Sequence, residues 1–193
     1  MVVERVKIAL VSSSPRRREI LELVGFKYRV VKADVEEELH PTPELTAVKN
    51  AEAKVVAARE LLEPGEVGLA ADTIVVLDGE VLGKPSTREE AVNYLKRLSG
   101  RWHKVITGFA LLMEGRLVSG YEEALVKFKR MTLREIEWYV STGEPMDKAG
   151  AYGIQGIGAL FIERIEGDFF TVMGLPISRI YDILDLELIN GGV

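Results

Sequence analysis

The stretch Val6–Val24, VKIALVSSSPRRREILELV, decides how the chain begins to fold. Its first part, Val6–Val11, is a nearly continuous apolar run, which is typical of a strand inside a sheet covered on both faces. The residues from Pro15 onward repeat apolar side chains at helical spacing, and Gly25 is typical of the position just after a helix. The stretch therefore predicts a strand that runs directly into a helix.

The turn between this strand and helix has the composition of an anion site. Small residues at Ser12–Ser14 allow a ligand close to the backbone, and Pro15 suits the first helical position because it needs no amide donor. A helix start presents unpaired N–H groups and a partial positive charge, and Arg16 and Arg17 add planar forks that match phosphate oxygens. We predict a phosphate site here. The alternative is that Ser14 caps the helix and the arginines form a solvated face.

Composition limits the class of protein. The 193 residues are 47% hydrophobic, which is enough to bury a sizeable core. The absence of cysteine excludes disulfides, thiol catalysis and zinc–thiolate sites, and a net charge of −5 argues against a nucleic-acid partner. With no apolar stretch of membrane-spanning length and no signal-peptide core, we expect a cytoplasmic protein with no membrane partner.

Strands and helices are predicted to follow one another along the rest of the chain. Strands are expected at 26–30, 67–71, 74–77, 80–82, 159–165 and 169–172, with two long ones within 102–128. Helices are expected from Thr42 to near Pro64, from Ser86 to Leu98, from Thr132 to near Gly143, and from Pro176. Loops are expected at 34–38 and 147–158. The pattern predicts a single α/β domain over residues 1–193, with a long, twisted, mixed sheet, flanking helices and two lobes around a cleft.

Asp72 occupies an unusual place for a carboxylate. It interrupts an apolar strand, where its desolvation needs compensation, and a metal ion or a water that it activates would provide this. The alternative is an aspartate that caps a turn by bonding to the next amides.

Taken alone, the acidic run Glu36–Glu38 is typical of a solvated loop. Beside a triphosphate site, one of these carboxylates would help to hold Mg²⁺, which binds one or two carboxylates together with substrate oxygens and water. Lys54 and Lys84 have the same two interpretations, as surface lysines or as cations that converge on a polyanion.

Gln155 lies in a glycine-dense segment. A loop carboxamide is the simpler interpretation, but an amide both donates and accepts, so it can pair with the edge of a uracil-type base. The two histidines, His40 and His103, have no partner pattern and are assigned to surface or structural roles.

Four motifs, taken together, resemble the Maf family of nucleoside triphosphate pyrophosphatases. They are Ser12–Arg17, Ala71–Val75, Gly83–Pro85 and Asp147–Gly156, and they occur in the order of the family. The resemblance runs from about Ile8 to Leu184, nearly the whole chain.

The resemblance implies a fold, a reaction and a cofactor. The fold is that of the inosine-triphosphatase-like group, in a homodimer, and the reaction converts a nucleoside triphosphate to the monophosphate and pyrophosphate. A divalent cation, Mg²⁺, Mn²⁺ or Co²⁺, is implied, with Asp72 and Glu37 on the metal side and Asp72 also as the proton acceptor for the attacking water. The run of glutamates leaves Glu36 and Glu38 open as alternatives to Glu37.

The resemblance also implies which residues contact the substrate. It implies that the phosphates are bound by Ser12, Arg17, Lys54 and Lys84. The subgroup that acts on dTTP and UTP is marked by Arg16, Thr73 and Gln155. The substrates expected are therefore dTTP and UTP, with CTP and modified pyrimidine nucleotides also open.

Two rival functions fit the same anion site. One is a non-catalytic nucleotide-binding regulator of cell division, which turnover distinguishes. The other is a pyrophosphatase for other non-standard nucleotides, which base preference distinguishes.

Overall fold

A computed structural model describes residues 1–189. The chain divides into two compact units, each assembled from separate segments. The first unit contains Met1–Asp72, Thr107–Glu122 and the chain from Gly174 onward, and the second contains Thr73–Ile106 and Glu123–Met173. The expectation of a single domain over 1–193 stays a prediction.

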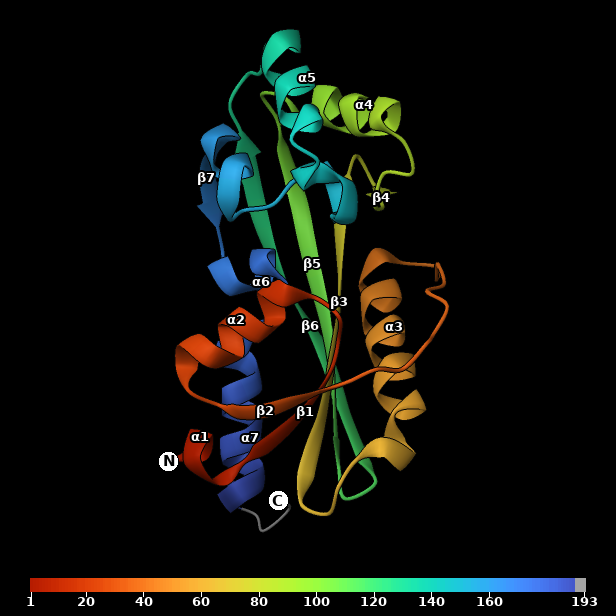
Figure 1. Ribbon diagram of the computed structural model, residues 1–193, viewed down its shortest axis with the longest axis vertical. Coiled ribbons are helices and arrows are strands. Elements are labelled where there is room, and N and C mark those ends of the chain that lie inside the picture. Colours follow the sequence, from red (N-terminus) through yellow and green to blue (C-terminus); the bar gives the residue numbers. More distant parts are fainter. Residues whose placement is uncertain (190–193) are drawn as a thin grey trace. The chain divides into compact units, whose positions relative to one another are not determined.

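The described residues form helices and strands in alternation (Figure 1). The α-helices are α1 (Val2–Arg5), α2 (Pro15–Val24), α3 (Pro43–Ala57), α4 (Arg88–Leu98), α5 (Leu133–Ser141), α6 (Phe169–Met173) and α7 (Ile177–Ile189). The strands are β1 (Lys7–Val11), β2 (Lys27–Val31), β3 (Glu66–Leu77), β4 (Glu80–Leu82), β5 (Trp102–Met113), β6 (Arg116–Phe128) and β7 (Ile162–Glu166). Short 3₁₀ turns are η1 (Arg59–Leu61), η2 (Glu144–Asp147), η3 (Ala149–Ala151) and η4 (Gly156–Phe161).

Within residues 1–189 the strands form one sheet in the order β2-β1-β3-β5-β6-β7, and β4 pairs with β3. β1 is parallel to β2 and β3, whereas β3–β4 and β6–β7 are antiparallel. The sheet is therefore mixed, and the predicted α/β class with a long mixed sheet and flanking helices is confirmed.

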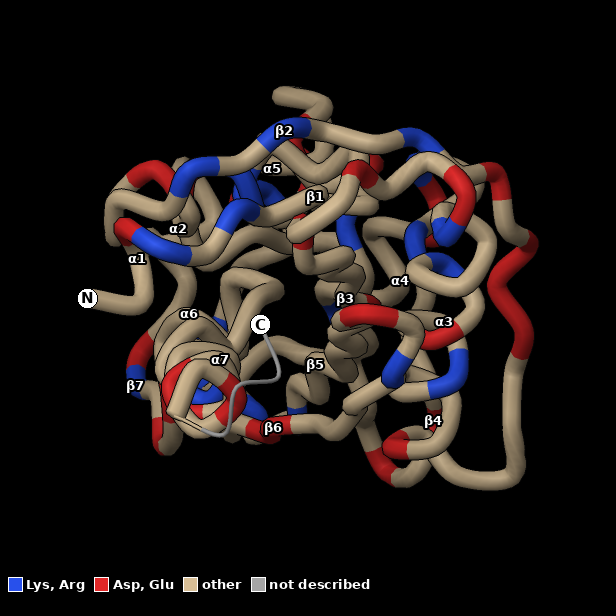
Figure 2. Tube along the Cα trace, turned by 90° about the horizontal axis from the view of Figure 1, so that it is seen from below, with Lys and Arg blue, Asp and Glu red and all other residues tan. Residues whose placement is uncertain are grey.

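In the first unit, helices cover both faces of the sheet. Figures 1 and 2 show α2 and α7 on one face and α3 on the other. Ala51 and Val55 of α3, and Ala58 just after it, are fully buried in a cluster with apolar residues of β1, β2, β3 and β5. α3 approaches β5 very closely, because a Cβ on Gly108 would lie 2.2 Å from the carbonyl carbon of Ala47. This contact fixes the distance between α3 and the sheet.

In the second unit, α4 packs against α5, and side-chain caps define both helices. The capping box of Thr132 with Glu135 is confirmed. The predicted box of Ser86 with Glu89 is wrong by one residue, because Thr87 accepts the hydrogen bond from the amide of Glu90 and begins α4. The Asp78-Gly79 hairpin turn is confirmed, with φ of 54° and 81°.

The structure corrects four predicted elements. The helix expected from Thr42 to near Pro64 ends at Ala57, and the 3₁₀ turn η1 follows it. β3 continues through Asp72 and Thr73 instead of breaking there. Residues 169–172, predicted as a strand, belong to helix α6, because a short apolar run does not distinguish the two. The strand predicted at 159–165 begins only at Ile162, after η4.

The last helix matches its prediction closely. α7 buries Ile177, Ile180 and Leu184, as expected, but Tyr181 is only partly buried. None of the helices within residues 1–189 is long and apolar enough to cross a membrane.

Candidate active site

The turn between β1 and α2 is organised by Ser12. Its Oγ accepts hydrogen bonds from the amide of Ser14 at 3.1 Å and from Nη1 of Arg17 at 3.0 Å. Ser14 occupies the N-cap position, but its side chain makes no capping hydrogen bond. The alternative interpretation, in which Ser14 caps the helix with its side chain, is therefore wrong. Ser12 instead holds the amide of Ser14, the residue just before the first helical position, Pro15.

Arg17 is a firmly held cation. Its Nε donates to the carbonyl of Gly174 at 2.8 Å, in addition to the bond with Ser12. Burial lowers the pKa of the Arg17 guanidinium, and the negative charges of Asp72 and Glu37 oppose this shift. A guanidinium remains protonated in proteins, so the turn carries a fixed positive charge within the field of two carboxylates. Figure 2 shows lysines and arginines along α2 and β2.

Asp72 is the centre of a polar cluster in an otherwise apolar strand. The residue is only 6% exposed, and both of its carboxylate oxygens have partners. Oδ1 lies 2.8 Å from Nζ of Lys54, and Oδ2 accepts a hydrogen bond from Nδ2 of Asn50 at 3.1 Å. The ammonium and the amide, both from α3, are the compensation that a buried carboxylate requires.

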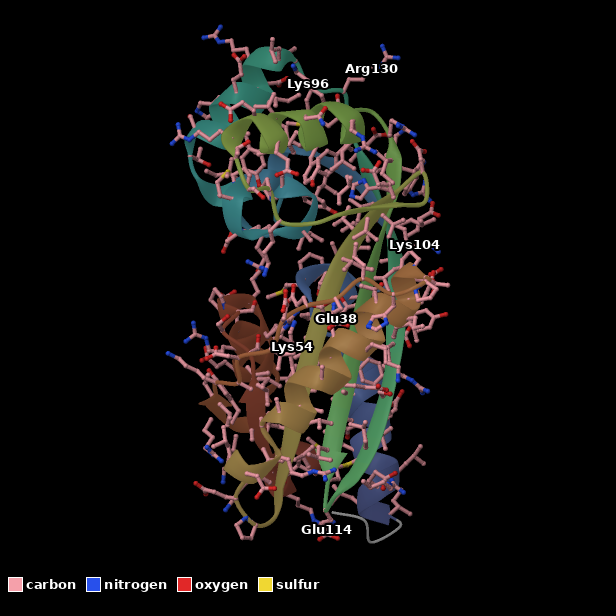
Figure 3. The ribbon with its side chains drawn as sticks, turned by 90° about the vertical axis from the view of Figure 1, so that its right-hand side faces the viewer. Glu38, Lys54, Lys96, Lys104, Glu114 and Arg130 are labelled. Atoms are coloured by element: carbon pink, nitrogen blue, oxygen red, sulfur yellow. The ribbon has the colours of Figure 1, made fainter. Side chains whose placement is uncertain are left out.

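Lys54 connects Asp72 to the acidic loop between β2 and α3. Its Nζ also contacts Oε1 of Glu37 at 2.7 Å, so two carboxylates converge on one ammonium. Of the three glutamates left open by the sequence, Glu37 is the one that shares this cation with Asp72. Figure 3 labels Lys54 on α3 beside Glu38 of the loop.

Two further residues of α3 hold the loop, and sequence reasoning missed both. Oδ1 of Asn50 accepts a hydrogen bond from the amide of Glu38 at 3.0 Å. One turn earlier, Oγ1 of Thr46 accepts from the amide of His40 at 2.9 Å. Both side chains are buried. A polar residue within the apolar stripe of a helix, four residues before a lysine, is the signal that could have identified Asn50.

The carboxylates fit a divalent cation only with help from a substrate. Residues 1–189 contain no group of three or more His, Cys, Asp or Glu side chains that could hold a metal. Glu37 and Asp72, however, converge on one point, and a hard cation such as Mg²⁺ commonly binds one or two carboxylates plus phosphate oxygens and water. The donor set fits a metal that arrives with a phosphate ligand.

Three predicted site residues belong to the second unit. Thr73 follows Asp72 on β3, so its side chain points to the other face of the strand. Lys84 is exposed in the turn after β4. This turn is held by a hydrogen bond that the amide of Gly150 donates to the carbonyl of Gly83 at 3.0 Å. Gly150 adopts a φ of 67° and packs on Val75.

Gln155 is partly exposed within the glycine-dense segment, immediately before η4. The carboxylate of Glu144 accepts hydrogen bonds from the amides of Ile157 and Gly158, both at 2.9 Å. Glu144 was not among the predicted site residues.

His103 has a structural role. It is 3% exposed, and its Nε2 lies 2.7 Å from the hydroxyl of Tyr152. Burial lowers the pKa of His103 to about 4, so the ring is neutral at pH 7. His40 contributes its backbone to the loop contact with Thr46.

Comparisons with known proteins agree on one family. The chain matches the family described as "Maf-like protein" over residues 7–187. A protein of Aquifex aeolicus named dTTP/UTP pyrophosphatase is 47% identical over 188 residues, which cover 96% of this chain and 98% of that protein. A protein of Pyrococcus abyssi with the same name is 46% identical over 180 residues, which cover 93% of this chain and 95% of that one.

A solved structure is also similar. The Ham1 protein of Staphylococcus aureus is 18% identical, with a TM-score of 0.45 over 81% of this chain and 79% of that one.

Proposed function

Because the chain belongs to the Maf family, we propose that it hydrolyses dTTP and UTP to the nucleoside monophosphate and pyrophosphate. Its relatives at 46–47% identity carry the name dTTP/UTP pyrophosphatase and align over nearly their whole length. The observation that carries the proposal is the cluster of Asp72, Lys54 and Glu37, which lies in the field of Arg17. Such a cluster combines a carboxylate suited to accept a proton with cations suited to phosphates.

The reaction is attack of water on the α-phosphorus. The water oxygen bonds to the α-phosphorus, the bond from that phosphorus to the bridging oxygen of the β-phosphate breaks, and pyrophosphate leaves. Asp72 accepts the proton from the water. Phosphate oxygens compete with Asp72 for the ammonium of Lys54, and this exchange frees a carboxylate oxygen for the water.

The phosphates are held by cations and by the start of α2. Arg17 is oriented by Ser12 and the carbonyl of Gly174, so it presents its guanidinium without a further loss of side-chain freedom. Lys84 is a further cation for the phosphates in this proposal. Glu37 and Asp72, together with phosphate oxygens, would hold a divalent cation, which would supply neutralisation of the phosphate charge.

The base is selected by Arg16, Thr73 and Gln155 in this proposal. The carboxamide of Gln155 offers a donor and an acceptor, which match the O4 and N3–H edge of uracil and thymine. We also propose a cytoplasmic homodimer that uses Mg²⁺, Mn²⁺ or Co²⁺, since the sequence resemblance implies these properties.

The test is a panel of nucleoside triphosphates incubated with Mg²⁺, Mn²⁺ or Co²⁺ in ¹⁸O-labelled water. We expect turnover of dTTP and UTP above that of GTP and ATP, with pyrophosphate as the direct product and the label in the monophosphate. Orthophosphate as the direct product, or the label in pyrophosphate, would place the attack at another phosphorus. Tight binding without turnover would favour the nucleotide-binding regulator, and a preference for purine nucleotides would favour the pyrophosphatase for non-standard nucleotides.

A further inference from the structure

The segment around Gln155 is held at both ends by one pair of side chains, Tyr139 and Glu144. At its start, the amide of Gly153 donates to the Tyr139 hydroxyl at 3.2 Å. At its end, the Ile157 amide donates to Oε2 of Glu144 and the Gly158 amide donates to Oε1. The hydroxyl of Tyr139 completes the arrangement by donating to Oε1 of Glu144 at 2.8 Å. The pair therefore closes a loop that has Gln155 near its centre.

The glycines of the segment show how closely the loop fits this pair. A Cβ on Gly156 would lie 2.7 Å from Oε2 of Glu144, and Gly156 also has a φ of 77°. A Cβ on Gly158 would lie 2.6 Å from the Tyr139 hydroxyl and 2.2 Å from the carbonyl oxygen of Gly153. Both positions therefore require glycine, because the backbone approaches the carboxylate and the phenol directly.

The pair is fixed by its own surroundings. Tyr139 is fully buried on α5, and its ring packs against Phe161 with the ring centroids 5.4 Å apart. Burial raises the pKa of Glu144, but the hydrogen bonds from Ile157, Gly158 and Tyr139, together with the charge of Lys148, outweigh this, so its pKa lies below the ordinary value. Glu144 is therefore ionised at pH 7, and a carboxylate accepts all three hydrogen bonds at once.

We propose that Glu144, together with Tyr139, is a positioning residue for base selection: it holds the 153–158 loop so that Gln155 presents its amide at a fixed place. The inference rests on the proposed function, because it assumes that Gln155 contacts the base. Glu144 itself touches neither the substrate nor the reacting atoms. It acts through the backbone of the loop.

The substitution Glu144→Gln tests this directly. The side chain keeps its size, but only one of its two terminal atoms still accepts hydrogen bonds. Whichever way the amide is turned, its NH₂ group faces the amide of Ile157 or that of Gly158, so one backbone donor loses its acceptor. The loop then shifts, and Gln155 shifts with it.

The measurement is kcat/KM for UTP divided by kcat/KM for GTP. We expect Glu144→Gln to lower this ratio about tenfold, the effect of one lost charge-assisted hydrogen bond. The loss should appear mainly as a higher KM for UTP, because a base contact acts equally in the ground and transition states. An unchanged ratio in a folded variant would overturn the inference.

A matched control is Glu135→Gln. Glu135 is on α5, as Tyr139 is, and within residues 1–189 its hydrogen bonds close the capping box with Thr132 and do not reach the loop. We expect it to lower the melting temperature and leave the ratio unchanged. If it lowers the ratio as much as Glu144→Gln does, general loosening of the second unit explains the result and the inference is wrong.

Tyr139→Phe provides an independent route if Glu144→Gln does not fold. It keeps the buried ring but removes the acceptor for Gly153 and the donor to Glu144, so we expect the same fall in the ratio. In a Gln155→Ala background, neither substitution should change the ratio further, and an additive loss would contradict action through Gln155.

The two proposals fail in different ways. A wild-type protein that does not prefer UTP over GTP contradicts the proposed function itself. A wild-type preference that survives Glu144→Gln, or Tyr139→Phe where Glu144→Gln does not fold, contradicts only the role of the pair.

Discussion

The Asp72 cluster and the Gln155 loop are built by opposite means. Around Asp72, charged side chains from a strand, a helix and a loop meet one another, with Lys54 between two carboxylates. Around Gln155, backbone amides meet a single carboxylate, that of Glu144, and glycines leave the room for it.

The difference matches two kinds of work. Charged side chains exchange partners when a charged ligand arrives, so the first region suits phosphate binding and proton transfer. A backbone fixed by hydrogen bonds has few alternative conformations, so the second region suits the recognition of the shape of a base. The following changes test whether the two regions are separable in this way.

Asp72→Asn should have the largest effect. An amide cannot accept the proton from water, so kcat is expected to fall about 10²–10⁴-fold, with the ratio of UTP to GTP turnover unchanged. Steady-state kinetics on purified protein measures both quantities. Asp182→Asn, an exposed aspartate of α7, is the control and should retain full activity. Wild-type turnover in the Asp72 variant would remove it as the base.

Gln155→Glu should show the reverse pattern. A carboxylate lacks the donor that O4 of the base requires, so the preference for UTP over GTP is expected to fall about ten- to hundredfold. Competition assays with mixed nucleotides measure this preference. If kcat falls as steeply as in Asp72→Asn while the preference is retained, the division of roles between the two regions is wrong.

Asn50→Ala should have an intermediate effect within the Asp72 cluster. The substitution removes one hydrogen bond to Asp72 and the acceptor for the amide of Glu38, so kcat should fall about tenfold through misplacement of the carboxylate and the loop. The control is Asn93→Ala, an exposed asparagine of α4. Unchanged kcat would show that Lys54 alone positions Asp72.

His103 should produce the smallest effect, on stability. Its pKa is about 4 in the folded protein, below about 6.5 in an unfolded chain, because burial disfavours the charged ring. Nδ1 of this ring has no hydrogen-bond partner within residues 1–189, so protonation gains nothing there.

The unfolded state binds more protons between these two pKa values, so stability falls as the pH decreases from 6.5 toward 4. We expect a loss of about 1 kcal/mol between pH 7 and 5.5, measured by urea denaturation. The loss should be smaller in His103→Gln. Equal pH dependence in both proteins would show that His103 is already protonated or exposed when folded.

Much of the fold could be predicted because local signals agree with the tertiary structure. The apolar run before Ser12, the Asp78-Gly79 turn and the Thr132 capping box each specify their element by short-range chemistry. At 169–172 the apolar run is too short to distinguish a strand from a helix, and the predicted strand was wrong.

The site was harder to predict for the same physical reason. Asp72 looks like a break in a strand because the sequence does not show that Lys54 and Asn50, on a helix, lie beside its carboxylate and compensate its charge. Glu144 looks like a surface glutamate because, apart from the Tyr139 hydroxyl, its partners are backbone amides, which have no sequence signature beyond the glycines near them. The roles of the proposed site residues stay predictions.

At Gly108 the helix α3 meets strand β5 with no side chain between them. A helix that contacts a sheet through side chains can slide or tilt as those side chains repack. Where backbone contacts backbone directly, no side chains are available to repack. The distance between α3 and the sheet is therefore fixed, and with it the positions of Lys54 and Asn50. A single methyl group at position 108 would push α3 outward and move both side chains away from Asp72 together.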